Sequence, residues 1–262
     1  MYTLSACGGW FEGSASDRIR AAKKNGFDAL EILGWKDMDL EAVASTLKET
    51  GMKISAILIQ SRDEEKQALI ANTHGIVWKD AHGAFVDALG ETLEAAKILG
   101  VNKIVVTTGN ERFDVSRGVQ HDLVVDALKL GADVVKGSGV EIVLEPLNIL
   151  VNHKGYFLVT TKESVEVINE VGRPEVRLLF DVYHQQISEG NVIRNITENI
   201  DLIGHIHVGD NPGRMEPGTG EINYKNVFKA IKETGYSEFV VFECGRTVDA
   251  ETVCRNMLAL VE

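Results

Sequence analysis

The chain has 262 residues, of which 44% are hydrophobic, and it carries a formal net charge of −12 at pH 7. This acidic balance excludes a nucleic-acid-binding surface, which needs clustered Lys and Arg to displace counterions from phosphates. Three widely spaced cysteines without a CxxC pair favour a reducing compartment, so we expect a cytoplasmic protein. No stretch approaches the roughly 18 apolar residues of a membrane span, and the first residues lack the basic segment of a signal peptide.

Short apolar runs alternate with longer amphipathic stretches along the chain. The apolar runs are four to seven residues long and rich in β-branched side chains, which favours strands. The predicted strands cover 2–7, 27–33, 53–59, 103–107, 140–145, 177–180, 202–208 and 239–243. Amphipathic patterns between them predict helices at 17–24, 40–50, 84–99, 120–136, 162–170, 224–234 and 250–260. Asp39 is placed to cap the second helix, and several helices end at a glycine: Gly26, Gly51, Gly100, Gly172 and Gly235.

This regular alternation predicts parallel strands joined by helical crossovers, and eight such units close a single (β/α)8 barrel over residues 1–262. The rival arrangement is an open doubly wound sheet, but its usual GxGxxG turn after the first strand is absent. No linker rich in Pro, Gly or Ser divides the chain, which indicates one domain. The connection 61–82 is unusually long, so we expect it, with Arg62 and Trp78, to contribute to the pocket wall or a lid.

Four consecutive predicted strands end in a polar residue: Glu145, Asp181, His207 and Glu243. The active site of such a barrel lies at the C-terminal ends of its strands, so these side chains should meet at one rim. Each alone has an ordinary explanation, as a helix cap, an ion pair or a packed core histidine. Three carboxylates gathered together would repel one another strongly unless a cation lay among them. The set therefore predicts one divalent metal, with Mn²⁺, Mg²⁺ or Co²⁺ favoured by the oxygen ligands and Zn²⁺ as a further option.

The seventh predicted strand carries two histidines on the same face, His205 and His207. His207 lies nearer the strand end and is the expected ligand. His205 is expected one layer deeper, as a packing residue or as a partner of a metal ligand. Cys244 directly follows Glu243, so on a strand it faces away and is a poor ligand candidate.

Two more residues are candidates for substrate binding. His184, three residues after Asp181, could contact a substrate hydroxyl or make a structural hydrogen bond. Arg214 lies in a turn-rich loop and is a candidate clamp for a carboxylate or another oxygen. Its alternative is a surface ion pair with Glu216 or Glu221.

Several motifs resemble those of the xylose-isomerase-like barrel superfamily of sugar isomerases and epimerases, most of all the hydroxypyruvate isomerase family. They are LEPLN at 144–148, FDVYHQQ at 180–186, GHIHVGDNPGR at 204–214, EPGTGEINY at 216–224 and FEC at 242–244. The resemblance implies a TIM barrel and a metal site of the four strand-end residues, with Glu145 and Glu243 as the acid/base pair. It also implies a homodimer or homotetramer, since family members commonly have these forms.

One position departs from the hydroxypyruvate isomerase pattern. That family usually places a glutamine where His207 stands, whereas ketose 3-epimerases carry a histidine in GHxHxGE, followed by an arginine. Their arginine lies one residue closer to the histidine than Arg214 does. The motifs therefore fall between two substrate classes.

The resulting expectation is a metal-dependent isomerase or epimerase of a small hydroxy-carbonyl substrate, either hydroxypyruvate or a keto-sugar. One of the two glutamates removes the proton next to the carbonyl to give an enediolate. Reprotonation at the neighbouring carbon gives isomerisation, and reprotonation on the opposite face gives epimerisation. An inosose-type dehydratase is an alternative that shares the barrel and a similar metal set. An endonuclease-IV-like DNA repair enzyme would need more histidines and a basic groove, and a non-catalytic binding barrel would have no need of paired glutamates.

Overall fold

The computed structural model describes residues 2–71 and 73–261. Within these residues the strands form one sheet in which every neighbouring pair is parallel, in the order β3-β2-β1-β9-β8-β7-β6-β5-β4. The strands are β1 (Thr3–Cys7), β2 (Ala29–Glu31), β3 (Lys53–Ile54), β4 (Ile57–Leu58), β5 (Lys103–Val106), β6 (Glu141–Leu144), β7 (Val176–Asp181), β8 (Ile203–Val208) and β9 (Phe239–Phe242).

The two end strands of this order, β3 and β4, are parts of one predicted strand, 53–59. β3 pairs with β2, and β4 pairs with β5, so this segment joins the two edges of the sheet. The amide of Ser55 continues the first ladder, donating to Leu30 O at 3.1 Å, and the amide of Ile59 continues the second, donating to Val105 O at 3.0 Å. The sheet thereby curls into a barrel. The predicted (β/α)8 barrel is confirmed, with its third strand broken in the middle.

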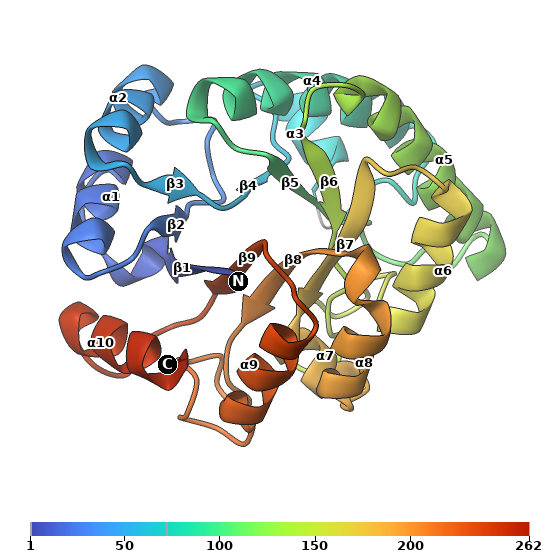
Figure 1. Cartoon of the computed structure of the whole chain (residues 1–262). Helices are drawn as coiled ribbons and strands as arrows, with labels where there is room; N and C mark the ends of the chain where they lie inside the picture. The colour runs from blue at the N-terminus through green and yellow to red at the C-terminus, as the bar shows by residue number, and fades with distance from the viewer. Residues whose placement is uncertain (1, 72, 262) are drawn as a thin grey trace.

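The helices form an outer ring around the strands (Figure 1). They are α1 (Ala15–Lys24), α2 (Leu40–Thr50), α3 (Glu64–Leu69), α4 (Ala81–Leu99), α5 (Arg117–Val135), α6 (Thr161–Val171), α7 (Val182–Ser188), α8 (Val192–Asn199), α9 (Tyr224–Glu233) and α10 (Ala250–Val261). Two short 3₁₀ turns, η1 (Gly8–Trp10) and η2 (Ile200–Leu202), complete the described elements. The seven predicted helices are present, whereas α3, α7 and α8 were not predicted.

The helix ends follow the predicted signals. Asp39 caps α2 by accepting a hydrogen bond from the amide of Ala42 at 3.0 Å. Each glycine predicted to end a helix has a positive φ, the conformation that glycine adopts without strain: Gly26, Gly51, Gly100, Gly172 and Gly235.

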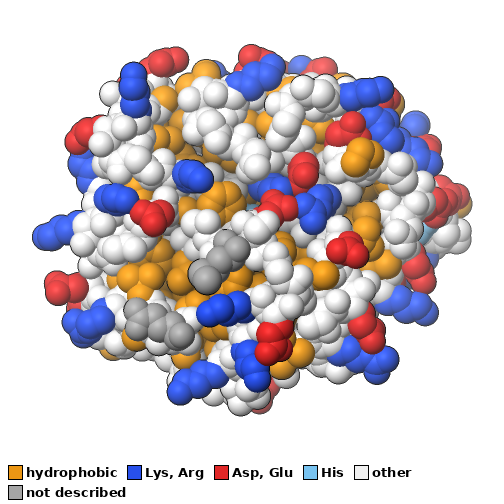
Figure 2. All heavy atoms as spheres, viewed as in Figure 1, with side chains coloured by type: hydrophobic (Ala, Val, Ile, Leu, Met, Phe, Trp, Pro, Cys, Tyr) orange, Lys and Arg blue, Asp and Glu red, His pale blue; other side chains and the backbone are white. Residues whose placement is uncertain are grey.

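Alternating strand residues divide the core into two parts. Residues such as Ile104 and Ile142 face the helices and belong to the main core. The residues beside them point the other way, and a separate small cluster forms inside the barrel from Ala56, Val105, Val143 and Leu179. No helix in the described part of the chain is long and apolar enough to cross a membrane. On the face drawn in Figure 2, Lys and Arg side chains are interspersed with Asp and Glu rather than gathered in one basic field.

Candidate active site

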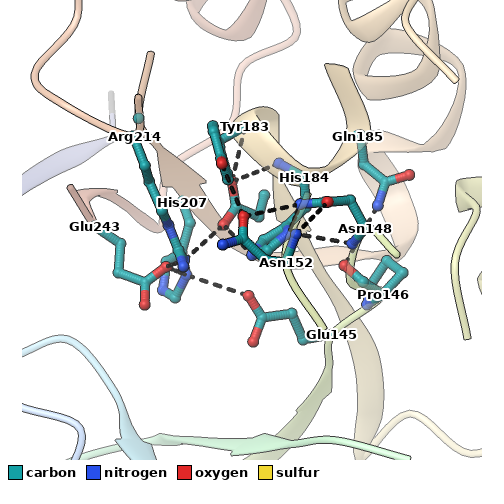
Figure 3. Close-up of polar contacts among 12 residues, drawn as sticks. Glu145, Pro146, Asn148, Asn152, Tyr183, His184, Gln185, His207, Arg214 and Glu243 are labelled. Carbon is teal, nitrogen blue, oxygen red and sulfur yellow. Dashed lines mark hydrogen bonds and ion pairs between the residues drawn. The ribbon is translucent and has the colours of Figure 1, made fainter. Parts of the chain in front are cut away.

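The four predicted ligands come together at the C-terminal rim of the barrel. Each of them offers one ligand atom, and these four atoms lie within 4.8 Å of one another. Glu145 follows β6, Asp181 ends β7, His207 lies near the end of β8 and Glu243 follows β9. In the view of Figure 3, the carboxylates of Glu145 and Glu243 lie on either side of His207. The parallel strands bring these residues to one rim although 98 positions separate the first from the last.

Asp181 divides its two carboxylate oxygens between the fold and the site. Oδ1 caps α7 by accepting hydrogen bonds from the amides of Tyr183 at 2.8 Å and His184 at 3.3 Å. Oδ2 points to the cluster, 3.5 Å from Arg214 Nη2 and 3.6 Å from His184 Nε2. The helix cap thus fixes the carboxylate so that its free oxygen faces the site.

His207 is buried, and both of its ring nitrogens face carboxylates. Its Nε2 lies 3.1 Å from Glu31 Oε1, and its Nδ1 lies 3.2 Å from Glu243 Oε2 and 3.6 Å from Glu145 Oε1. Burial opposes a charge on the imidazole, but Glu31 and Glu243 outweigh it and raise the pKa of His207 well above its usual value. In the metal-free protein, His207 is therefore a cation among carboxylates.

The two glutamates have opposite pKa shifts in the metal-free protein. Burial raises the pKa of Glu145 to about 7, and the nearby carboxylates Glu243 and Asp181 add to this effect. Glu243 is also buried, but His207 and Arg214 lower its pKa to about 2. At neutral pH the site therefore holds one carboxyl that readily gains a proton and one that stays ionised, an arrangement suited to an acid/base pair.

Arg214 reaches into the site from the loop after β8. Its Nη2 donates to Glu243 Oε2 at 2.5 Å, and its guanidinium lies 5.3 Å from the centre of the Tyr183 ring. The backbone of Arg214 has φ 54°, a left-handed conformation that is unusual for a residue with a side chain. Two backbone hydrogen bonds hold it there, from its own amide to Asp210 O and from the amide of Gly245 to its carbonyl. Arg214 therefore points into the site instead of forming the alternative ion pair with Glu216 or Glu221.

His184 presents one ring nitrogen to the site. Its Nδ1 accepts hydrogen bonds from Asn148, from the backbone amide at 3.1 Å and the side-chain amide at 2.7 Å. Because Nδ1 is an acceptor, the proton of the neutral ring is on Nε2, which is buried, has no hydrogen-bond partner among the described residues and faces Asp181. Burial lowers the pKa of His184 to about 4, so the ring is neutral and offers one donor. Figure 3 shows these residues grouped beside the carboxylates.

The third predicted substrate-binding residue, Arg62, lies elsewhere on the rim. Its guanidinium lies 5.4 Å from the centre of the Trp35 ring, and its Nε donates to Lys36 O at 3.3 Å. None of its contacts within the described part of the chain involves the four ligands. Trp78, from the same 61–82 connection, stacks on His74 and lies beneath the guanidinium of Arg112. The connection contains α3 and the start of α4, and its residue 72 lies outside the described residues.

A pocket of about 380 Å³ opens next to the ligand cluster. It is lined by Glu31 and Glu243, by Cys7 and Gly8 at the end of β1, and by Arg18 of α1. This volume falls within the usual size of small-molecule sites. The structure therefore has space for a small substrate immediately beside two of the acidic groups.

The residues present fit a divalent metal. His207 Nδ1 is buried, has no well-formed hydrogen bond among the described residues and is directed at carboxylate oxygens. Three carboxylates with one imidazole form a hard donor set, typical of Mn²⁺, Mg²⁺, Co²⁺ or Zn²⁺ sites. A bound ion would also replace the positive charge that His207 carries without it.

Sequence reasoning missed two residues of this site. Glu31 ends β2, and its carboxylate contacts both His205 and His207; the signal available was an acidic residue inside the apolar run 27–33, two residues before its end. Asn148 orients His184, and it directly follows a strand-end motif. His205 was expected one layer below His207, and the structure shows it completely buried and paired with Glu31.

Known proteins resemble this chain in sequence and in fold. Hydroxypyruvate isomerase of Escherichia coli (strain K12) is 29% identical over 224 residues, covering 85% of this chain and 84% of that protein. A crystal structure of an AP endonuclease, family 2, from Brucella melitensis has a TM-score of 0.90 at 24% identity and covers 99% of both chains. D-allulose 3-epimerase from Methylomonas sp., in complex with D-allulose, has a TM-score of 0.76 at 20% identity and covers 99% of this chain and 89% of that one. At these identities the two structural likenesses establish the fold alone.

The expectation that the chain is an isomerase is confirmed by its sequence relatives, which are named hydroxypyruvate isomerase and 2-oxo-tetronate isomerase. The model of the xylose isomerase-like TIM barrel family matches residues 19–260, nearly the whole chain. The chain belongs to the xylose isomerase-like TIM barrel family.

Proposed function

We propose that this protein is a metal-dependent isomerase or epimerase of a small hydroxy-carbonyl compound, either hydroxypyruvate or a keto-sugar. The observation that carries the proposal is the convergence of Glu145, Asp181, His207 and Glu243 around one point at the barrel rim. One divalent ion, Mn²⁺, Mg²⁺, Co²⁺ or Zn²⁺, would be held by these four residues. When bound, it would supply a Lewis acid that polarises the substrate carbonyl.

The chain's own residues would move the protons. One glutamate removes the proton from the carbon next to the carbonyl, and the electron pair left behind forms the C=C bond of an enediolate. In isomerisation, a proton is returned to the former carbonyl carbon and the neighbouring oxygen loses its proton to become the new carbonyl. In epimerisation, the other glutamate returns a proton to the original carbon from the opposite face. Both carboxylates lie within 3.6 Å of His207 Nδ1, so two proton-transfer groups stand at the same cluster, as both outcomes require.

The remaining groups would bind substrate oxygens. Arg214 supplies a forked cationic donor, suited to a carboxylate or to vicinal hydroxyls. His184 supplies one neutral N–H donor whose direction Asn148 fixes. We retain Arg62 as a candidate that acts only if its loop moves toward the site.

Two relatives suggest the substrate classes to test. The Escherichia coli relative is named for hydroxypyruvate, a hydroxy-keto acid, and a structural neighbour is named for a ketohexose. The endonuclease named among the structural neighbours is a poorer guide, because the net charge of −12 opposes DNA binding and the cluster contains a single histidine. A cytoplasmic location stays a prediction from the sequence, and a homodimer or homotetramer stays an implication of the family resemblance.

A screen with NMR detection tests the proposal. Metal-loaded protein is incubated in D₂O with hydroxypyruvate, tetruloses and free ketohexoses, and deuterium at the carbon next to the carbonyl is measured. We expect exchange and a new isomer with one class. The Glu243→Gln variant should retain the fold by circular dichroism and lose turnover by about 10²–10⁴-fold. Full activity in that variant contradicts the two-glutamate mechanism, and water loss without exchange indicates a dehydratase.

A further inference from the structure

Glu31 lies beneath the ligand cluster and contacts two histidines at once. It ends β2, and only 4% of the residue is exposed. Its Oε1 lies 3.0 Å from His205 Nε2 and 3.1 Å from His207 Nε2. The two histidines are neighbours on one face of β8, with ring centres 5.0 Å apart. One carboxylate oxygen, Oε1 of Glu31, therefore contacts the Nε2 atom of each of the two rings.

We infer that Glu31 is a positioning residue that fixes His207 so that Nδ1, and not Nε2, faces the metal. An ionised carboxylate only accepts hydrogen bonds, so both Nε2 atoms must donate to it. The nitrogen of His207 that is left for a metal is then Nδ1. This inference deepens the proposed function and rests on it, because it presumes that the four-residue cluster binds a metal.

The surroundings of His207 agree with this assignment. Nδ1 is buried, lacks a well-formed hydrogen bond among the described residues and lies near the oxygens of Glu243 and Glu145. A ring rotated by a half-turn about Cβ–Cγ would place carbon atoms where Nε2 and Nδ1 now lie, and would lose both the bond to Glu31 and the nitrogen that faces the carboxylates. Carboxylate partners of metal-binding histidines orient the ring in this way and increase the basicity of the ligand nitrogen.

His205 holds the carboxylate of Glu31 in place. Its Nε2 donates to the same oxygen of Glu31, and the side chain is completely buried on the strand that carries His207. With two donors converging on Oε1, the carboxylate cannot rotate without breaking both hydrogen bonds. His205 therefore fixes Glu31, and Glu31 fixes His207.

A second metal held by Glu31, His205 and His207 is the competing explanation, since their ligand atoms also lie close together. The nitrogen-to-oxygen distances of 3.0 and 3.1 Å are those of hydrogen bonds. Both nitrogens also point at a single oxygen, which leaves no central position for an ion between three separate ligand atoms. The geometry favours the hydrogen-bonded arrangement, and metal stoichiometry distinguishes the two.

Glu31→Gln tests the role of the carboxylate, with Glu216→Gln as the matched control. Glu216 is equally buried, at 5% exposed, and accepts hydrogen bonds from the backbone and hydroxyl of Thr247 without touching His207. We expect Glu31→Gln to weaken Mn²⁺ binding by about 10–100-fold in calorimetric titrations, with one ion per chain before and after. Glu216→Gln should keep the wild-type affinity. Unchanged affinity in Glu31→Gln overturns the inference, and two ions in the wild type reduced to one in the variant support the second metal instead.

Nitrogen NMR of the histidine rings in the wild-type protein gives an answer even if Glu31→Gln does not fold. A spin-active cadmium isotope serves as the probe metal. We expect coupling between cadmium and His207 Nδ1, with a proton retained on Nε2, and coupling to Nε2 overturns the inference. If the wild-type protein binds neither Mn²⁺ nor cadmium, the proposed function itself fails. Binding through Nε2 contradicts only the role of Glu31.

Discussion

Arg214 and Glu243 form the closest contact between a candidate substrate-binding residue and a candidate metal ligand. Nη2 of Arg214 donates to Oε2 of Glu243 at 2.5 Å and lies 3.5 Å from Asp181 Oδ2. The guanidinium therefore occupies a position next to two oxygens that a metal would use. A cation in this place competes with a metal for negative charge.

This competition predicts opposite effects of Arg214→Met on metal binding and on catalysis. Without substrate, the variant should bind Mn²⁺ about 3–10-fold more tightly, because a competing charge has been removed. Its kcat/KM should fall by about 10–100-fold, because the forked donor for the substrate is lost. Calorimetry and steady-state kinetics measure the two effects. Arg246→Met, an exposed arginine two residues after Cys244, is the control and should change neither; weaker metal binding in Arg214→Met disproves the competition.

His184 should affect substrate binding without affecting the metal. Its Nε2–H faces the site, but His184 is not one of the four candidate ligands. His184→Gln should lower kcat/KM by about 10–100-fold and leave the Mn²⁺ dissociation constant within about twofold. His82→Gln is the matched control, since His82, on α4, is also buried but bonds the carbonyl of Ile76 away from the site. It should lower stability and leave kcat/KM unchanged, and a loss of metal affinity in His184→Gln would make His184 a ligand.

The sequence predicted the parts of the site that lie at strand ends. Glu145, Asp181 and Glu243 each end an apolar run, and parallel strands bring such ends to the same rim whatever the intervening loops do. Arg214 was predicted from its donor chemistry, but its direction depends on a left-handed backbone that the neighbouring loops impose. Local patterns do not encode such long-range contacts.

The features that the sequence did not predict are those in which one residue has two roles or in which the partners lie far away along the chain. Asp181 ends β7 and caps α7 with the same side chain, so the helix begins without the turn residues that normally announce one. Glu31 was hidden because its partners lie more than 170 residues away on β8. The break at 55–56 in the third strand leaves no mark in composition, and it appears only in the pairing, where the first part pairs with β2 and the second part with β5.

The raised pKa of Glu145 predicts a pH-dependent stability of the metal-free protein. Its pKa is about 7 in the folded state and about 4.3 in an unfolded chain. The folded state thus binds this proton more tightly, so the stabilisation is complete below the unfolded value and is lost as pH rises to about 7. Glu145→Gln keeps a neutral group at every pH. The difference in melting temperature between this variant and the wild type should be near zero at low pH. At pH values above 7 the variant should melt on the order of 5 °C higher than the wild type.

Thermal melts in the presence of a chelator measure this difference. Taking the difference removes the contribution of buried histidines such as His184, whose lowered pKa acts with the opposite sign in the same pH range. Glu12→Gln, at an exposed position, is the control and should give a flat difference. A flat profile for Glu145→Gln as well means that the pKa of Glu145 is the same in the folded and unfolded states, which contradicts the raised pKa.

Gly109 provides a test of how the loops hold the rim. Its φ is 96°, and a Cβ built there would lie 1.8 Å from His74 O, so the two backbones touch in a way that only glycine permits. Gly139 has a similar φ of 79° with open space around it, and Gly139→Ala measures the backbone strain alone. Gly109→Ala should therefore lower the melting temperature by on the order of 5 °C more than Gly139→Ala does.

The same substitution should reach the active site through Tyr156. The hydroxyl of Tyr156 accepts from the amide of Thr108, next to Gly109, and donates to the carbonyl of Glu145 at 2.9 Å. Displacing Gly109 shifts this tyrosine and with it the backbone of a candidate ligand. At a temperature below the melting temperature of Gly109→Ala, where this variant is folded, we expect it to bind Mn²⁺ several-fold more weakly than the wild type. Gly139→Ala should bind the ion as the wild type does. Equal Mn²⁺ affinities in the two variants would show that the loop stabilises the fold without positioning Glu145. The Tyr156→Phe variant, which keeps the ring and removes the hydroxyl, measures directly what the hydrogen bond to the carbonyl of Glu145 contributes to Mn²⁺ binding.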